Sequence, residues 1–272
     1  MMKQLTQNVF VEPNILACNL GLITTSAGNV LIDSPLLPVD AVKWREEALK
    51  MGEVMYLINT EEHPDHFQCC DFLPGTLVSS KATRDFLKAN ESAELITQRV
   101  QSSPESVALM KSCSVRLADI TFEESMTIHL GGLMFELMSI PGHSPGGIGV
   151  FIPEEKVVFT TDIIFHKAKS WLQVADPEQW LVSLKKIEAL PVEHIVPGHG
   201  EICTKDYLKE QAQIVQGWID LVKSAIKRGL TQEQLWDEFK CPDPYPKQPG
   251  TPLTEEGLDK ANIARLYSIY SK

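Results

Sequence analysis

The sequence lacks a long hydrophobic run, a signal-peptide pattern and a dense cluster of basic residues. No apolar stretch approaches the roughly 20 residues that a helix needs to cross a bilayer, and the N-terminal MMKQLTQNVF has no apolar centre typical of signal peptides. The 272 residues carry 25 basic and 36 acidic side chains, which gives a formal net charge of −11. An acidic surface repels phosphate backbones and anionic lipids. We therefore expect a cytoplasmic protein that binds neither nucleic acid nor a membrane.

C-x-x-C motifs and nucleotide-binding motifs are absent as well. The six cysteines are scattered, with no C-x-x-C pair, so thiols are expected rather than a disulfide framework. The sequence contains neither the G-x-x-x-x-G-K-[ST] motif nor a Rossmann glycine pattern, so a nucleotide cofactor is not expected. With 43% hydrophobic residues, the chain can still bury a substantial core.

The first two hundred residues alternate strand and helix signals. Strand-like apolar runs lie at 20–25, 29–33, 54–59, 126–130, 133–140, 149–152 and 157–161. A helical pattern covers residues 38–51, and residues 80–112 are mostly helical and polar. Asp176 and Pro177 suit the N-cap and first position of a helix that runs to about Ala189. This alternation predicts a mixed α/β chain.

The character of the sequence changes after residue 200. Residues 205–228 predict a long amphipathic helix, Thr231 to Gln234 form a capping box, and residues 254–270 predict a last helix. Five prolines make residues 242–252 an expected extended loop. We expect a core over residues 1–204 and a C-terminal helical segment, 205–272, packed on the same domain.

Four of the seven histidines follow strand-like segments in short loops. His63 and His66 lie in TEEHPDH, His143 in IPGHSPGG and His199 in VPGHG, while Asp162 ends the run VVFTTD. Strand ends at one edge of a sheet bring distant sequence positions together. The order and types of these side chains therefore indicate a metal site rather than separate charged turns.

The spacing within the first motif suits two neighbouring metal ions. Alternation along the loop sends Glu61 and His63 to one point, and it sends Asp65 and His66 to another a few ångströms away. Two-metal sites require such points about 3.5–4 Å apart.

A serine-hydrolase motif offers a competing interpretation. Residues 142–146, GHSPG, fit the nucleophile elbow G-x-S-x-G, and Asp162 and His199 follow in the order expected of an α/β-hydrolase. The elbow requires a helix directly after Ser144, but the following PGGIG cannot begin one and leads into a strand-like run. This interpretation also leaves TEEHPDH unexplained.

The order EEHPDH, GHS, TTD and PGHG resembles the metallo-β-lactamase-fold superfamily. The signature of that family is H-x-H-x-D-H, a later histidine, a bridging aspartate and a final histidine, and VLIDS with Asp33 resembles a recurrent strand of the family. The resemblance spans residues 15–205. It implies an α/β (α+β) fold, a four-layer αββα sandwich with the metal site along one edge.

The resemblance also implies a ligand set. It places His63 and His143 at a first metal site. It places Asp65, His66 and His199 at a second, with Asp162 between the two sites. The departure is Glu61, which stands where the family has its first histidine, whereas the phase of Glu62 points that side chain away. Glutamate coordinates through oxygen, which shifts the metal preference from zinc towards iron or manganese.

The expected function is hydrolysis by a dinuclear metal centre. Two divalent ions, zinc foremost with iron or manganese as alternatives, would share a hydroxide that attacks an ester, thioester, lactone or amide of a small molecule. Asp65 would ligate the second ion and orient the nucleophile. Two alternatives remain open: a non-haem di-iron oxidoreductase or oxygenase that uses the Glu61-containing site, and a non-catalytic metal-binding sensor. The sequence decides neither the substrate nor whether the C-terminal segment shapes the pocket or joins a homodimer.

Overall fold

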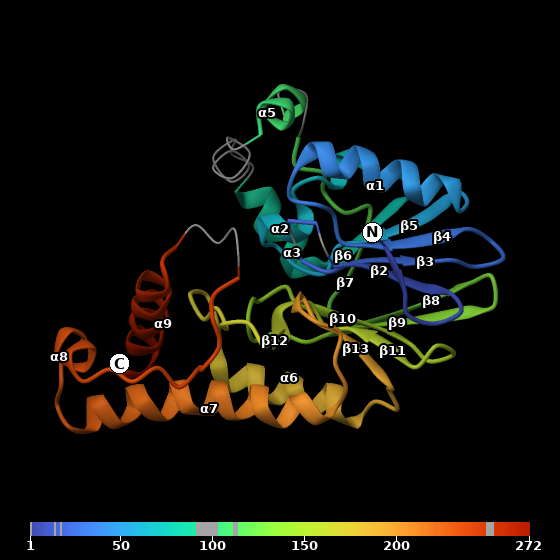
Figure 1. Ribbon diagram of the computed structural model, residues 1–272. Helices are drawn as coiled ribbons and strands as arrows, with labels where there is room; N and C mark the ends of the chain where they lie inside the picture. The colour runs from blue at the N-terminus through green and yellow to red at the C-terminus, as the bar shows by residue number, and fades with distance from the viewer. Residues whose placement is uncertain (1, 14, 17, 91–102, 111–113, 249–252) are drawn as a thin grey trace.

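The computed structural model describes residues 2–13, 15–16, 18–90, 103–110, 114–248 and 253–272. Two β-sheets lie face to face, and helices cover the outer face of each (Figure 1). The four layers are those of the predicted αββα sandwich, so the predicted fold class is confirmed.

The first sheet has seven strands. Their order is β1 (Lys3–Gln4), β2 (Val9–Glu12), β3 (Leu20–Ile23), β4 (Asn29–Ile32), β5 (Val54–Ile58), β6 (Thr76–Ser80) and β7 (Ile120–Phe122). β1 to β4 pair antiparallel, whereas β4 to β7 pair parallel. The carboxyl ends of β4, β5 and β6 therefore meet at one edge.

The second sheet has five strands. Their order is β13 (His194–Val196), β11 (Val157–Phe159), β10 (Ile148–Ile152), β9 (Leu133–Ser139) and β8 (Ser125–Leu130). β8 to β11 pair antiparallel, and β11 pairs parallel with β13. A short parallel pair, β12 (Phe165–His166) and β14 (His199–Gly200), lies beside this sheet.

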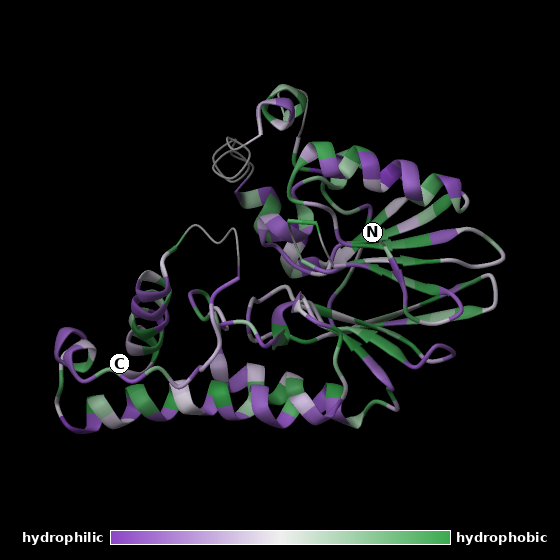
Figure 2. Cartoon of the chain, viewed as in Figure 1, coloured by the Kyte–Doolittle hydropathy of each residue, from purple (hydrophilic) through white to green (hydrophobic). Residues whose placement is uncertain are grey.

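The strands alternate their side chains between two cores because successive residues point to opposite faces. In β3 and β4, Leu22 and Leu31 pack with Trp44 of α1 (Pro38–Lys50) on the outer face of the first sheet. Ile23 and Ile32 face the second sheet instead, in the core between the two sheets. Figure 2 shows the strands largely hydrophobic, while the outer helices carry polar residues on their exposed sides.

Local sequence signals define the ends of several helices. Asp176 caps α6 (Pro177–Ala189) by accepting a hydrogen bond from Gln179 N at 3.1 Å. Thr231 and Gln234 form the predicted capping box of α8 (Gln232–Asp237). These two predictions are confirmed.

The C-terminal helices belong to the outer layer of the second sheet. α7 (Asp206–Lys227) packs against α6, and α9 (Glu255–Tyr270) packs against α7. Trp218 and Leu266 share one buried cluster with Trp180 and Ile195. α7 and α9 thus contribute to the core on the outer face of the second sheet, while the predicted division at residue 204 stays a prediction.

The remaining α-helices lie on the same side of the first sheet as α1 or at its edge (Figure 1). They are α2 (Pro64–Phe67), α3 (Lys81–Ala89) and α5 (Pro104–Met110). The helical prediction for residues 80–112 is confirmed for α3 and α5, and 91–102 and 111–113 lie outside the described residues. Residues 242–248 form no helix or strand, as predicted for the proline-rich loop, of which 249–252 are not described. None of the helices in the described ranges combines the length and apolar character needed to cross a membrane.

Candidate metal centre

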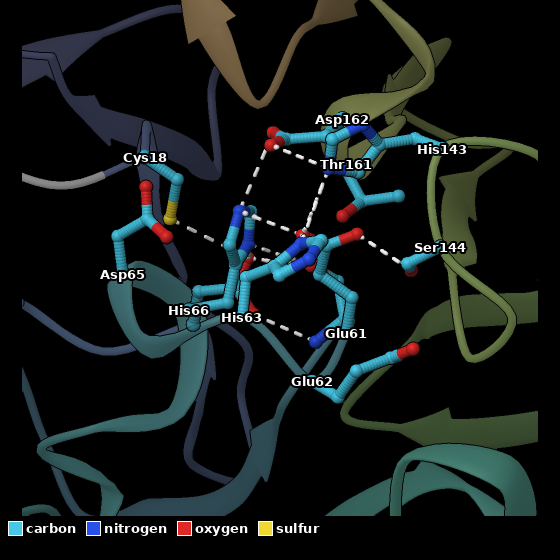
Figure 3. A network of polar contacts seen from close by, with 12 residues as sticks. Cys18, Glu61, Glu62, His63, Asp65, His66, His143, Ser144, Thr161 and Asp162 are labelled. Carbon is cyan, nitrogen blue, oxygen red and sulfur yellow. Dashed lines mark hydrogen bonds and ion pairs between the residues drawn. The ribbon is translucent and has the colours of Figure 1, made fainter. Parts of the chain in front are cut away.

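Four chain segments meet at the edge where the two sheets face each other. The loop after β5 carries Glu61 and His63 and continues into α2, the loop after β9 carries His143, and a 3₁₀ turn after β11 (Thr161–Ile163) carries Asp162. His199 follows β13 and begins β14. Figure 3 shows His63, His66, His143 and Asp162 pointing towards one another from these segments, whereas Glu62 points away.

The first cluster contains Glu61, His63, His143 and Asp162, with ligand atoms within 4.8 Å of one another. His63 Nδ1 lies 2.5 Å from Glu61 Oε1 and 3.1 Å from His143 Nε2. His143 Nε2 lies 3.3 Å from Asp162 Oδ2. These separations bring two imidazoles and two carboxylates to a common point.

The second cluster contains Asp65, His66 and His199, again within 4.8 Å. His199 Nε2 lies 3.3 Å from both Asp65 Oδ2 and Asp162 Oδ2. His66 Nε2 lies 3.3 Å from Asp162 Oδ1. Asp162 therefore contacts histidines of both clusters, as a bridging ligand requires.

Hydrogen bonds fix the tautomers of two histidines. His143 Nδ1 donates to the carbonyl oxygen of Trp171 at 2.8 Å, because a carbonyl can only accept. His66 Nδ1 lies 2.8 Å from Asp33 Oδ2 and in turn donates to that carboxylate. Each ring then presents the lone pair of Nε2 to the cluster. Metal-ligating histidines are oriented by such partners of the second nitrogen.

Asp33 is held in a strained backbone conformation directly after β4, with φ of 59°. Its carboxylate accepts hydrogen bonds from Thr60 N at 2.7 Å and from Thr60 Oγ1 at 2.6 Å. A non-glycine residue in the left-handed region costs free energy, and the surrounding hydrogen bonds maintain it here. Asp33 thereby joins the end of β4 to His66.

Glu61 is completely buried, and both of its carboxylate oxygens have partners. Oε1 faces His63, and Oε2 accepts a hydrogen bond from Ser144 Oγ at 2.8 Å. Glu62 contacts Gly146 N at 3.2 Å and Thr83 instead, away from the cluster. The structure thus places Glu61, and not Glu62, among the candidate ligands.

The carboxylates of the clusters act strongly on the histidines. Burial lowers the pKa of His63, but the Glu61 carboxylate outweighs it and raises the pKa to about 9. Burial likewise lowers the pKa of His199, but Asp162 and Asp65 raise it to about 10. Excess negative charge of this kind attracts a cation as well as protons.

Two features show that the residues fit metal ions. His66 Nε2 and Asp162 Oδ1 are buried and form no hydrogen bond within the described residues, which is costly unless another partner satisfies them. A Cβ built on Gly198 would lie 1.9 Å from Asp162 Oδ1, so only glycine leaves room for that carboxylate. Nitrogen and oxygen donors in this number suit divalent ions such as zinc.

The serine-hydrolase interpretation does not agree with the structure. Ser144 is buried and donates to Glu61, not to a histidine. The next element along the chain is strand β10, so no helix follows the serine as an elbow requires.

The structure brings all seven predicted ligands to this edge: Glu61, His63, Asp65, His66, His143, Asp162 and His199. Their role as ligands stays a prediction. Sequence reasoning missed four contributors, namely Ser144 beside Glu61, Thr60 and Cys18 beside Asp33, and the carbonyl of Trp171. The GHS motif was a signal for Ser144 only in retrospect, since its partner lies 83 positions away.

Comparisons with known proteins agree with this geometry. The family model described as metallo-beta-lactamase superfamily matches residues 13–199. A linear primary-alkylsulfatase of Pseudomonas sp. (strain ATCC 19151) is 24% identical over 165 residues, which cover 55% of this chain and 30% of that protein. A hydroxyacylglutathione hydrolase of Mesorhizobium japonicum is 31% identical over 114 residues, which cover 42% of each. The chain therefore spans less than half the length of these curated relatives.

Solved structures share the fold. A metallo-beta-lactamase from Pontibacter korlensis has a TM-score of 0.63 at 18% identity and covers 79% of this chain and 98% of its own. A stereoselective inverting sec-alkylsulfatase from Pseudomonas sp. has a TM-score of 0.75 at 13% identity and covers 99% of this chain and 50% of its own. The second of these matches extends over the C-terminal helices as well.

Proposed function

Since this chain belongs to the metallo-beta-lactamase superfamily, as its sequence motifs predicted, we propose that it is a metal-dependent hydrolase of small-molecule esters or thioesters. One observation carries the proposal. Two clusters of buried and half-buried histidines and carboxylates meet at a single aspartate, Asp162, at the edge of the αββα sandwich. That arrangement is what a dinuclear hydrolytic centre needs.

Each cluster would hold one ion, with zinc proposed for both. Glu61, His63 and His143 would ligate the first ion through one oxygen and two nitrogens, and Asp162 would lie between the ions. Asp65, His66 and His199 would ligate the second. When bound, such ions lower the pKa of coordinated water to near neutrality and polarise the bond that is attacked.

The side chains of the chain itself orient the reaction. Burial acts to raise the pKa of Asp65, but the hydrogen bond and charge of His199 outweigh it and hold that pKa well below its usual value. Asp65 is therefore ionised and would accept a hydrogen bond from the attacking water, which orients that water. Asp33 and the Trp171 carbonyl keep His66 and His143 in the tautomers that face the centre.

The relatives support the ester and thioester class. The name of the Mesorhizobium relative is hydroxyacylglutathione hydrolase, and an acylglutathione is a thioester. The alkylsulfatases, which match a larger share of this chain at lower identity, act by their names on sulfate esters. Attack by water at a thioester or ester carbonyl adds oxygen to carbon and expels a thiol or alcohol, so it needs no further co-reactant.

The proposal is tested on metal-free protein reloaded with zinc. We expect turnover of acyl thioesters or carboxylic esters only after zinc is added, and none in Asp162→Ala. Alkyl sulfates are tested in the same assay. If the protein hydrolyses these alone, its substrates are sulfate esters and not carboxylic esters or thioesters. If the protein binds zinc but turns over none of these substrates, the proposed hydrolase activity is refuted.

The buried carboxylate of Glu61 favours one second candidate, a non-haem di-iron oxidoreductase or oxygenase. Oxygen ligands shift preference from zinc towards harder ions such as iron. Iron-loaded protein that consumes oxygen and shows a visible absorption band, but that hydrolyses nothing, would support this candidate over the first.

A further inference from the structure

One side chain of the C-terminal helix α9 reaches the loop that supports the metal centre. Asn262 is completely buried and makes two hydrogen bonds to this loop. Its Nδ2 donates to the carbonyl oxygen of Ser170 at 3.0 Å, and its Oδ1 accepts from Leu172 N at 2.8 Å. The two bonds hold the backbone on both sides of Trp171.

Trp171 is the residue whose carbonyl oxygen accepts the Nδ1–H of His143 at 2.8 Å. The backbone that Asn262 clamps is thus the backbone that fixes the tautomer and direction of a candidate ligand. Partners of a metal-bound histidine orient its ring and affect metal affinity. The two hydrogen bonds of Asn262 thus position the Trp171 carbonyl, and Asn262 itself does not contact the candidate ligands.

Further contacts tie the same loop to the C-terminal region. Lys169 N donates to the carbonyl oxygen of Pro246 at 2.9 Å, and Ser170 N donates to Asp243 Oδ2 at 2.8 Å. Gln211 of α7 donates to Ser170 Oγ at 3.0 Å. Asn262 is the member of this set whose two bonds flank Trp171.

We propose that Asn262 is a positioning residue of the first metal site, which it serves by holding the Trp171 carbonyl against His143. The inference rests on the proposed function, since it requires His143 to be a ligand. It gives the C-terminal segment a role that the sequence left undecided: residues beyond the family match at 13–199 help to build the site.

The test is a zinc titration of the 272-residue chain against a competing chelator, which resolves the two dissociation constants. We compare the wild type with Asn262→Ala and with Leu266→Ala, a control on the same helix that removes buried apolar packing but none of these hydrogen bonds. The signal of His143 Nδ1–H, followed by NMR on histidine-labelled protein, gives a second readout that does not depend on activity.

We expect Asn262→Ala to weaken the first site by about 10- to 100-fold and to change the second far less. The Nδ1–H signal of His143 should broaden through faster exchange, and Leu266→Ala should leave both readouts at the wild-type values. If Asn262→Ala does not fold, Asn262→Asp replaces it: this isostere can still accept from Leu172 N but cannot donate to the Ser170 carbonyl. The same weakening and signal loss are then expected.

Three results would overturn the inference. The first is unchanged zinc affinity and an unchanged His143 signal in a folded Asn262 variant, and the second is an equal loss in Leu266→Ala, which would indicate general destabilisation. The third is a wild type that binds fewer than two zinc ions, which would refute the proposed centre too. Two bound ions without hydrolysis would refute the proposed activity alone, and the effect of Asn262 on zinc affinity would still decide the inference.

Discussion

Replacing Ser144 with alanine tests whether Glu61 is a metal ligand. Ser144 is 2% exposed, and its hydroxyl donates to Oε2 of Glu61 at 2.8 Å. The other oxygen, Oε1, faces His63. The hydroxyl therefore satisfies one oxygen and directs the other to the centre. Ser144→Ala leaves a buried carboxylate oxygen without this donor.

The size of the effect follows from the hydrogen bond that is lost. A hydrogen bond to a charged group contributes about 1.5–3 kcal/mol, and about 1.4 kcal/mol corresponds to a tenfold change in an equilibrium constant. We therefore expect the first zinc site to weaken by about 10- to 100-fold in Ser144→Ala, within the range for residues that orient metal ligands. The second site does not contain Glu61 and should change little.

The assay is the same chelator competition, with a matched control. Ser79→Ala removes an equally buried hydroxyl whose hydrogen bond, 2.9 Å to the carbonyl oxygen of Ser80, involves none of the candidate ligands. Ser144→Thr, which keeps the donor, should retain most of the affinity. In a Glu61→His background, Ser144→Ala should have a much smaller effect, because the carboxylate is gone. If Ser144→Ala and Ser79→Ala have equal zinc dissociation constants at the first site, the reasoning is refuted.

Three further predictions concern other parts of the molecule. His66→Ala should abolish turnover and leave the circular dichroism spectrum unchanged; retained activity would contradict the ligand assignment. Gly198→Ala should weaken zinc binding, because the new Cβ would lie 1.9 Å from Asp162 Oδ1, and unchanged affinity in a titration would contradict that packing. Asp259→Asn breaks the buried pair with Lys169, whose Nζ lies 3.1 Å from Asp259 Oδ1, and should lower the free energy of unfolding by about 3–5 kcal/mol in urea. Burial lowers the pKa of Lys169, but Asp259 outweighs it and raises that pKa above 10.5. The stability difference should therefore be constant from neutral pH to pH 10.5 and decline as the pH rises further; a difference that grows there would contradict the pairing.

Local signals were sufficient for much of the fold. The N-cap of α6 at Asp176 and the capping box of α8 at Thr231 depend on residues three positions apart, so the sequence alone contains the interaction. The short apolar runs at 20–25 and 29–33 likewise predicted two strands, and the structure pairs β3 and β4 antiparallel. Only the choice of which face meets which core required the tertiary structure.

In the candidate site, too, local motifs predicted some residues and tertiary packing was needed for the others. The order of His63, His143 and His199 after strand-like segments was enough to predict one edge for all three, because adjacent strands end together. The supporting contacts depend on residues that are distant in sequence. Ser144 lies 83 positions from Glu61, and Asn262 lies 92 positions from Ser170. No local pattern encodes such pairs, since they arise only when the two sheets and the C-terminal helices pack.

The central claim is a two-ion hydrolytic centre, and one measurement tests it most directly. Metal-free protein is titrated with zinc while hydrolysis of an acyl thioester is followed in the same samples. The account predicts that activity begins from zero and reaches its plateau at about two ions per chain. Full activity without added metal, or a protein that binds no zinc at this site, would contradict it.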